Sequence, residues 1–284
     1  MKNINLTWKK LIIFSVVIGV YTALMAIFDC FKYTSFKSIT VTFEVWIFFG
    51  IFIIMNSKSN KDAALKCFVF FLISQPLIYL LQVPFSWQHW GLFKYYKYWF
   101  GMTVLCIPMG YIGYYMKKDK WWGYLILFPM ILLTAFEFMT YLSYFTFSYP
   151  KYILICIFCI TVLIAYPLWI FKNKKIRIIG DLISITLIVI ISIYVFMNPL
   201  HYKTDIMGNG EKYQFDDTYK VYLKDSKYGN VDVVYLEEIE GYMIRADFVK
   251  EGKTEIILED PSGNKKIYKI NIKRDTYELK PENN

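Results

Sequence analysis

The sequence has little of what most soluble enzymes use for catalysis. Only 2 of its 284 residues are histidine, and only 5 are cysteine. It contains no G-x-x-x-x-G-K-[ST] phosphate-binding loop, no dinucleotide-binding glycine run, no G-x-S-x-G elbow and no H-E-x-x-H zinc motif. We therefore expect no ATP hydrolysis, no cofactor and no metal site, and a binding protein rather than an enzyme.

Acidic residues are scarce in the first 197 residues, which contain only six. The same segment contains 18 Lys and Arg, a net charge of +12, whereas residues 198–284 contain 14 against 17 acids, a net charge of −3. The basic residues of the first segment lie in short loops between apolar runs. Such a pattern indicates membrane topology, and we expect no nucleic-acid partner.

Apolar residues are abundant, at 56% of the chain, with 20% aromatic. They form runs that are long enough to cross about 30 Å of hydrocarbon, which takes roughly 17–25 helical residues. Seven such runs predict a seven-helix transmembrane bundle over residues 1–197, the first helix being an uncleaved signal-anchor. The runs are 11–28, 39–55, 63–83, 99–116, 121–143, 152–171 and 178–197.

The loops predict the orientation of this bundle. With a cytoplasmic N-terminus, the inner segments carry 13 Lys and Arg and the outer loops carry five. An excess of basic residues on the inner side is the usual rule for membrane proteins. We expect a multi-pass protein of a bacterial plasma membrane, with its C-terminal domain, residues 198–284, outside the cell.

The connector over residues 84–100 contains nine aromatic residues between Phe85 and Phe100. Trp and Tyr favour the headgroup layer, where one end of the side chain is apolar and the other is hydrated. We expect this stretch to lie at the outer membrane surface. It is interpreted either as an aromatic belt that anchors the helices or as part of a groove for a lipid or another ligand.

The C-terminal segment changes to a period of two. Apolar residues alternate with polar ones over 219–223, 242–248 and 268–272, and segments 231–237 and 253–259 are further candidates. Turn residues separate these runs, as in Pro261-Ser262-Gly263-Asn264. Five or six short strands in this length predict an antiparallel β-sandwich.

The end of this segment, GKTEIILEDPSGNKKIYKINIKRD, is similar to the final hairpin of bacterial immunoglobulin-like modules. The resemblance covers only the C-terminal tail and rests on the strand spacing and the Tyr-x-Ile-x-Ile ending. It implies an extracellular binding or spacer module without catalytic residues. No resemblance is found for the membrane region.

Two carboxylates inside the predicted spans are the leading candidates for a functional site, because ionisable groups are costly in a membrane. Glu44 lies five residues below the outer end of the second span, and Glu137 lies six residues below the outer end of the fifth. At 1.5 Å per residue the two have nearly equal depth. We expect them to approach one another in an outer cavity.

Other polar residues fall at the same outer level, namely Asp29, His89 and Tyr141, with His201 a further candidate. Three interpretations remain open for this group. Each glutamate could simply hydrogen-bond a neighbouring helix, the group could form an outward-open cavity for a cation or substrate, or it could hold a divalent metal ion. A third membrane carboxylate, Asp181, is expected to form an ion pair with Arg177 one turn away.

Cys156 and Cys159 form a C-x-x-C pair in the outer part of the sixth span. Two thiols at positions i and i+3 share a helix face and could exchange a disulfide, as in membrane thiol oxidoreductases. Those enzymes also need a second cysteine pair in an outer loop, where only Cys30 is available. Cysteine is also a common small apolar residue in membranes, so redox chemistry is the weaker interpretation.

These observations favour an envelope protein that meets a partner through residues 198–284, as a receptor, sensor or accessory subunit. A small transporter that uses Glu44 and Glu137 is the main alternative. A membrane thiol oxidoreductase is the third.

Overall fold

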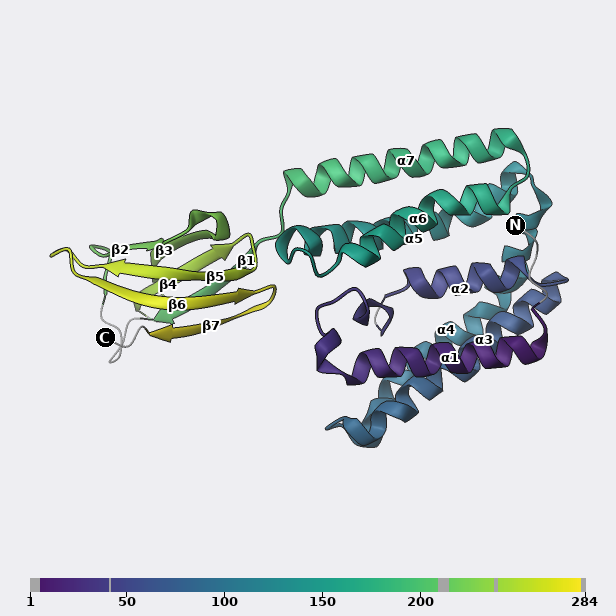
Figure 1. The fold of residues 1–284 in the computed structure, drawn as a ribbon, viewed down its shortest axis with the longest axis horizontal. Coiled ribbons are helices and arrows are strands. Elements are labelled where there is room, and N and C mark those ends of the chain that lie inside the picture. Colours follow the sequence, from purple (N-terminus) through teal and green to yellow (C-terminus); the bar gives the residue numbers. More distant parts are fainter. Residues whose placement is uncertain (1–5, 41, 209–214, 238–239, 282–284) are drawn as a thin grey trace. The chain divides into compact units, whose positions relative to one another are not determined.

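The computed structural model describes residues 6–40, 42–208, 215–237 and 240–281. Its N-terminal part is mostly helical, and its C-terminal part consists of antiparallel β-sheets (Figure 1). Seven α-helices are found in the described residues. They are α1 (Trp8–Ile27), α2 (Glu44–Met55), α3 (Asn60–Gln82), α4 (Phe93–Gly113), α5 (Trp121–Phe147), α6 (Ile153–Ile170) and α7 (Lys174–Met197).

Five of the described helices are long and apolar enough to cross a membrane: α1, α3, α5, α6 and α7. The other two differ from the sequence prediction of seven spans. Helix α2 has only 12 residues because a 3₁₀ turn, η2 (Lys37–Thr40), replaces the start of the predicted span. Helix α4 has 21 residues, but its first turns carry Lys94, Lys97 and several aromatic residues from the predicted interfacial connector.

Small residues allow the N-terminal helices to approach closely. A Cβ atom added to Gly19 of α1 would lie 3.0 Å from the Ser74 carbonyl oxygen of α3. One added to Gly110 of α4 would lie 3.0 Å from the Ala63 carbonyl oxygen, also in α3. Glycine at a helix contact permits backbone-to-backbone packing, which helices in lipid use in place of a hydrophobic driving force.

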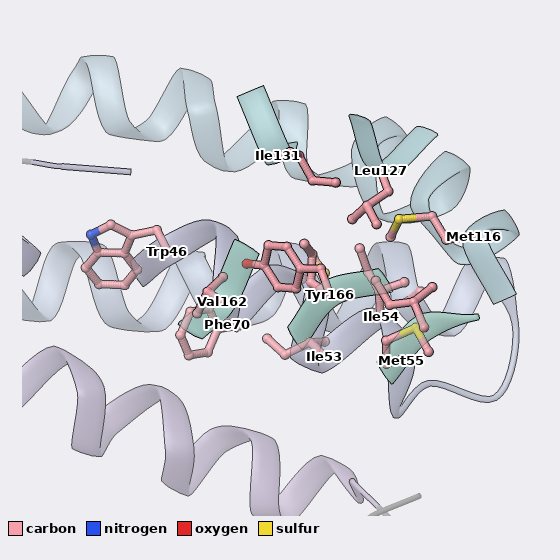
Figure 2. Packing of buried hydrophobic residues seen from close by; sticks show 14 of the residues in the cluster. Trp46, Ile53, Ile54, Met55, Phe70, Met116, Leu127, Ile131, Val162 and Tyr166 are labelled. Carbon is pink, nitrogen blue, oxygen red and sulfur yellow. The ribbon is translucent and has the colours of Figure 1, made fainter. Parts of the chain in front are cut away.

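In the described residues of the helical part, one large cluster of buried apolar side chains draws on six of the helices, and the partly buried Cys106 of α4 packs against it. Figure 2 shows part of this cluster, in which Tyr166 and Val162 of α6 lie near Phe70 of α3. Aromatic contacts connect α2 to α6, since the rings of Phe48 and Phe158 are 5.7 Å apart and nearly perpendicular. Helix α2 therefore packs between α3 and α6.

The C-terminal part contains two antiparallel sheets. The first has the order β1-β4-β3 and the second the order β2-β5-β6-β7. Inward residues of both sheets, including Ile244 and Phe248 of the first and Ile256 and Ile272 of the second, belong to one buried cluster. The strands are β1 (Tyr202–Gly208), β2 (Lys220–Leu223), β3 (Gly229–Leu236), β4 (Gly241–Phe248), β5 (Gly252–Glu259), β6 (Lys265–Lys273) and β7 (Thr276–Pro281).

The chain divides into two compact units that do not follow the sequence order. One comprises Met1–Tyr141 and Lys151–Ser192, and the other comprises Leu142–Pro150 and Ile193–Asn284. The second unit therefore includes the last turns of α5. Phe147 is part of its buried cluster, and the Phe147 carbonyl oxygen accepts a hydrogen bond of 2.8 Å from the Glu251 amide.

Candidate functional site

The start of α2 explains how a glutamate is buried among apolar helices. Glu44 is the first residue of α2 and is 0% exposed. Unpaired amide groups and the helix dipole make this end of a helix favourable for a carboxylate. The Thr42 hydroxyl lies 2.7 Å from Glu44 Oε1. In the described part of the chain, Glu44 Oε2 is buried without a hydrogen-bond partner.

The second carboxylate reaches the same helix end from α5. The Glu137 carboxylate, which is half-buried, accepts a hydrogen bond from the backbone amide of Phe43, the N-cap residue of α2. It is also close enough to Glu44 for the two to interact electrostatically. The structure thus brings together the two glutamates that the sequence places at equal depth.

Hydroxyl groups complete this arrangement. The Tyr141 side chain is 3% exposed and hydrogen-bonds to the side chains of Thr42 and Ser38. The Thr42 hydroxyl also lies 2.8 Å from the Ser38 carbonyl oxygen. Below, the carboxylate cluster means Glu44, Glu137, Thr42, Ser38 and Tyr141.

Two residues of α6 lie near the carboxylate cluster. Cys159, which is 0% exposed, is within electrostatic range of both Glu44 and Glu137. Tyr166 is within range of Glu44 and Cys159, and its hydroxyl is buried without a hydrogen-bond partner among the described residues. Figure 2 shows this hydroxyl directed toward the end of the bundle that carries Trp46. Sequence reasoning missed Tyr166 because nothing in the chain reveals which helix faces α2.

The C-x-x-C thiols are free and buried, and Cys156 interacts electrostatically with Cys159. Cys30, the outer cysteine that the sequence offered as a partner, is exposed in the 3₁₀ turn η1 (Asp29–Phe31). Burial disfavours the thiolate form that disulfide exchange requires. The arrangement therefore gives the two thiols a packing role beside the carboxylates.

The remaining candidates lie elsewhere. Asp29 is exposed in η1, and His89 is exposed at the start of the 3₁₀ turn η4 (His89–Leu92). Among the described residues, no interaction joins either of them to the glutamates. His201 belongs to the β unit, where its Nδ1 lies 2.8 Å from Asp247 Oδ1.

Thr134 lies one turn before Glu137 on α5, but its hydroxyl donates to the Met130 carbonyl oxygen at 2.9 Å within the helix. Asp181 is within electrostatic range of Arg177, but the expected ion pair is not found among the described residues, and Asp181 Oδ1 is buried there without a hydrogen-bond partner. No group of three or more His, Cys, Asp and Glu side chains able to hold a metal ion occurs in the described ranges.

The carboxylate cluster is therefore the part of the helical unit best suited to bind a small cation. It offers carboxylate and hydroxyl oxygens in an apolar surrounding. One of these oxygens, Glu44 Oε2, has no hydrogen-bond partner among the described residues. Comparisons with protein-family models, with curated proteins and with solved structures find no match to this chain.

Proposed function

We propose that this chain is a multi-pass protein of a bacterial plasma membrane, with a cytoplasmic N-terminus and an extracellular β-sandwich of immunoglobulin-like type. Five described helices able to cross a membrane support the membrane placement, and the 13-to-5 bias of basic residues, which is counted with seven crossings, supports the orientation. Five or seven crossings lead to the same side for the C-terminus. The shared buried cluster of the two sheets supports the sandwich.

We propose further that the membrane region is a small proton-linked transporter whose cation site is the carboxylate cluster. The observation that carries this proposal is that the Thr42 hydroxyl faces two acceptor oxygens but has only one hydrogen. Its hydroxyl lies 2.8 Å from the Ser38 carbonyl oxygen and 2.7 Å from Glu44 Oε1, yet a hydroxyl has one hydrogen to donate. A proton on Glu44 supplies the missing hydrogen. The Glu44 carboxyl group then donates to the Thr42 hydroxyl, and the Thr42 hydroxyl donates to the Ser38 carbonyl oxygen.

The surroundings of Glu44 agree with a bound proton. An ionised carboxylate is expensive in an apolar interior when one of its oxygens lacks a hydrogen-bond partner, as Glu44 Oε2 does among the described residues, whereas a neutral carboxyl group is much less so. Glu137 lies nearby, and two carboxylates at short range in a low dielectric need a shared proton or another cation between them. If another cation replaced this proton at the site, release of the proton would be coupled to binding of that cation, as proton-linked transport requires.

The shape of α2 provides a second argument. Interrupted or unusually short helices mark the binding sites of many secondary transporters. Helix α2 has 12 residues, begins at Glu44 and is separated from η2 by a break that includes Thr42. The carboxylate cluster lies at this break.

Infrared spectroscopy of the full-length protein in lipid tests the bound proton directly. We expect the band of a protonated carboxyl group at neutral pH, lost in Glu44→Gln and shifted in Glu137→Gln. Asp181→Asn is the matched control, because it removes a membrane carboxylate from α7 that lies outside the cluster. A band that survives in both glutamine variants and disappears in the control would refute the assignment.

Proteoliposomes with an internal pH-sensitive dye test the transport step. We expect a proton flux, driven by an imposed membrane potential, that falls about tenfold or more in each glutamine variant. The double variant should be no worse than the single ones, because neighbours in one network are non-additive. A flux equal to that of protein-free vesicles, in protein that shows the carboxyl band, would exclude transport while leaving proton binding intact.

A second candidate function is binding of an envelope partner through the β-sheets. Tyr235 of β3 is 53% exposed and its ring packs 5.2 Å from that of Tyr242 on β4. Exposed tyrosines are enriched at protein interfaces. A photoreactive residue at position 235 should crosslink one defined envelope protein on intact cells, and Lys266, on β6 of the other sheet, is the control position. Equal yields from both positions would count against a specific surface.

A further inference from the structure

A cleft of about 380 Å³ lies along α2, bounded by α3, α4 and α5. Its α2 wall consists of apolar residues that recur every three or four positions, from Phe43 through Gly50 to Ile54. Ile54 follows Phe43 by 11 residues, which corresponds to about 16 Å along the helix at 1.5 Å per residue. The α2 cleft thus has the length and character of a hydrocarbon-chain site.

The opposite wall is rich in flexible sulfur-containing side chains. Met102, Met109, Met116 and Met130 line it, together with the thiols of Cys67 and Cys106. Methionine adapts its shape to an apolar partner, and none of the described residues that line the cleft is a lysine, arginine, aspartate or glutamate. At the Phe43 end, the indole of Trp46 already donates to the Ile39 carbonyl oxygen at 2.9 Å.

Lysines gather at the other end of the α2 cleft. Met116, which lines the cleft, belongs to the 3₁₀ helix η5 (Tyr114–Lys118) and is followed by Lys117 and Lys118. The Tyr114 hydroxyl donates to the Lys58 carbonyl oxygen at 2.7 Å, which holds the α2–α3 connection against η5. In Figure 2, Met116 and Ile54 point into the same region at this end.

The acids nearby are already engaged. Asp62 forms a 2.8 Å ion pair with Lys66, and Asp119 accepts the backbone amides of Lys172 and Asn173. Lys117 donates to the Ser57 carbonyl oxygen at 2.8 Å, and it shares the electrostatic range of Asp62 with Lys66. The cleft therefore ends at an excess of positive charge.

We propose that the α2 cleft holds an acyl chain of an anionic phospholipid whose phosphate lies beside Lys58, Lys117 and Lys118. Basic pockets between membrane helices on the cytoplasmic side are the usual sites for anionic headgroups. An apolar cleft that ends in such a pocket matches both parts of the lipid. Its assignment to the cytoplasmic leaflet rests on the proposed topology, but the chemistry of the site does not depend on the proton site.

Two glycines provide a matched test. A Cβ atom at Gly50 or at Gly101 would meet no heavy atom within 4 Å, so both positions accept a side chain without a clash. Gly50 lines the cleft, whereas Gly101 of α4 does not. Gly50→Leu therefore fills the α2 cleft, and Gly101→Leu adds the same group outside it.

Native mass spectrometry of the purified, delipidated full-length protein measures binding of added phosphatidylglycerol or of phosphatidylcholine with identical acyl chains. The wild type should retain phosphatidylglycerol about fivefold or more over phosphatidylcholine. Gly50→Leu should retain about tenfold less phosphatidylglycerol, Gly101→Leu should equal the wild type, and Lys118→Gln should lose part of the headgroup preference. Equal retention of the two lipids, or equal retention by Gly50→Leu and the wild type, would overturn the proposal.

A photoreactive phosphatidylglycerol with a diazirine on its acyl chain tests the same site in the wild-type protein, without relying on a folded variant. The crosslinks should concentrate in residues 43–54 and 102–116. Helix α7 carries many exposed apolar residues and reports ordinary lipid contact. Labelling of α7 that equals or exceeds labelling of the cleft segments would overturn the proposal.

Discussion

Replacement of Gly229 by alanine tests the packing of β3 against β4. Gly229 has a φ of +134° and pairs with Phe248 across the two strands. A Cβ atom there would overlap the Asp247 carbonyl oxygen and lie 2.8 Å from the Phe248 Cα atom. Both obstacles belong to the backbone of β4, so the strand itself must move.

The expected cost has two parts. A non-glycine residue in this region of backbone space costs about 1–3 kcal/mol, and overpacking adds about 1–3 kcal/mol. Gly263→Ala is the matched control, because its φ is +86° but a Cβ atom there meets nothing within 4 Å. That variant should lose only roughly 1–2 kcal/mol of unfolding free energy.

Hydrogen exchange of the β3 and β4 amides in the full-length protein is the suitable assay. All 8 tryptophans precede residue 198, so tryptophan fluorescence does not report on the sheets. The summed loss of about 2–6 kcal/mol corresponds to exchange roughly 30 to 3 × 10⁴ times faster when exchange requires unfolding of the β unit. The reasoning is refuted if Gly229→Ala accelerates exchange no more than Gly263→Ala does.

Three further predictions follow from other contacts. Phe147→Ala should destabilise the β unit by about 3–5 kcal/mol because Phe147 is 1% exposed in its core, measured as a lower melting temperature than that of Phe145→Ala; equal melting temperatures would contradict the core position. Gly180→Leu should lower the thermal stability of the helical unit, since an added Cβ lies 2.9 Å from atoms of both α5 and α6, whereas Gly101→Leu should not. Protease added to spheroplasts should digest residues 198–284, and digestion only after lysis would place them in the cytoplasm.

Hydropathy predicted where the helices lie but not where α2 begins. Residues 39–43 contain two threonines but no charged residue, glycine or proline, so no strong composition signal marks the 3₁₀ turn and the break before Glu44. The strands show the same limit. Helix and strand periods predicted β2 to β6, whereas β1 was missed because a register shift between Asp205 and Met207 interrupts its alternation. Strand β7 was missed because only two apolar residues, Tyr277 and Leu279, carry its alternation before it ends at Pro281.

The candidate site was partly predictable for a similar reason. Counting residues along a helix gives depth, and the two glutamates that were paired by depth, Glu44 and Glu137, both lie at the start of α2. The direction in which a side chain points around the bundle depends on helix order, which the sequence does not contain. Asp29 and His89 share the predicted depth but lie outside the cluster, whereas Tyr166 lies near it from another helix.

The contact between Phe147 and Glu251 restricts how the chain can be inserted into a membrane. Phe147 ends α5, and Glu251 lies between β4 and β5, so both must be on the same side of the bilayer. The intervening chain must therefore cross an even number of times, which α6 and α7 satisfy only if both cross or neither does. A chain that inserted one of them alone would leave the β core without Phe147 and would expose the apolar side chains that Phe147 covers.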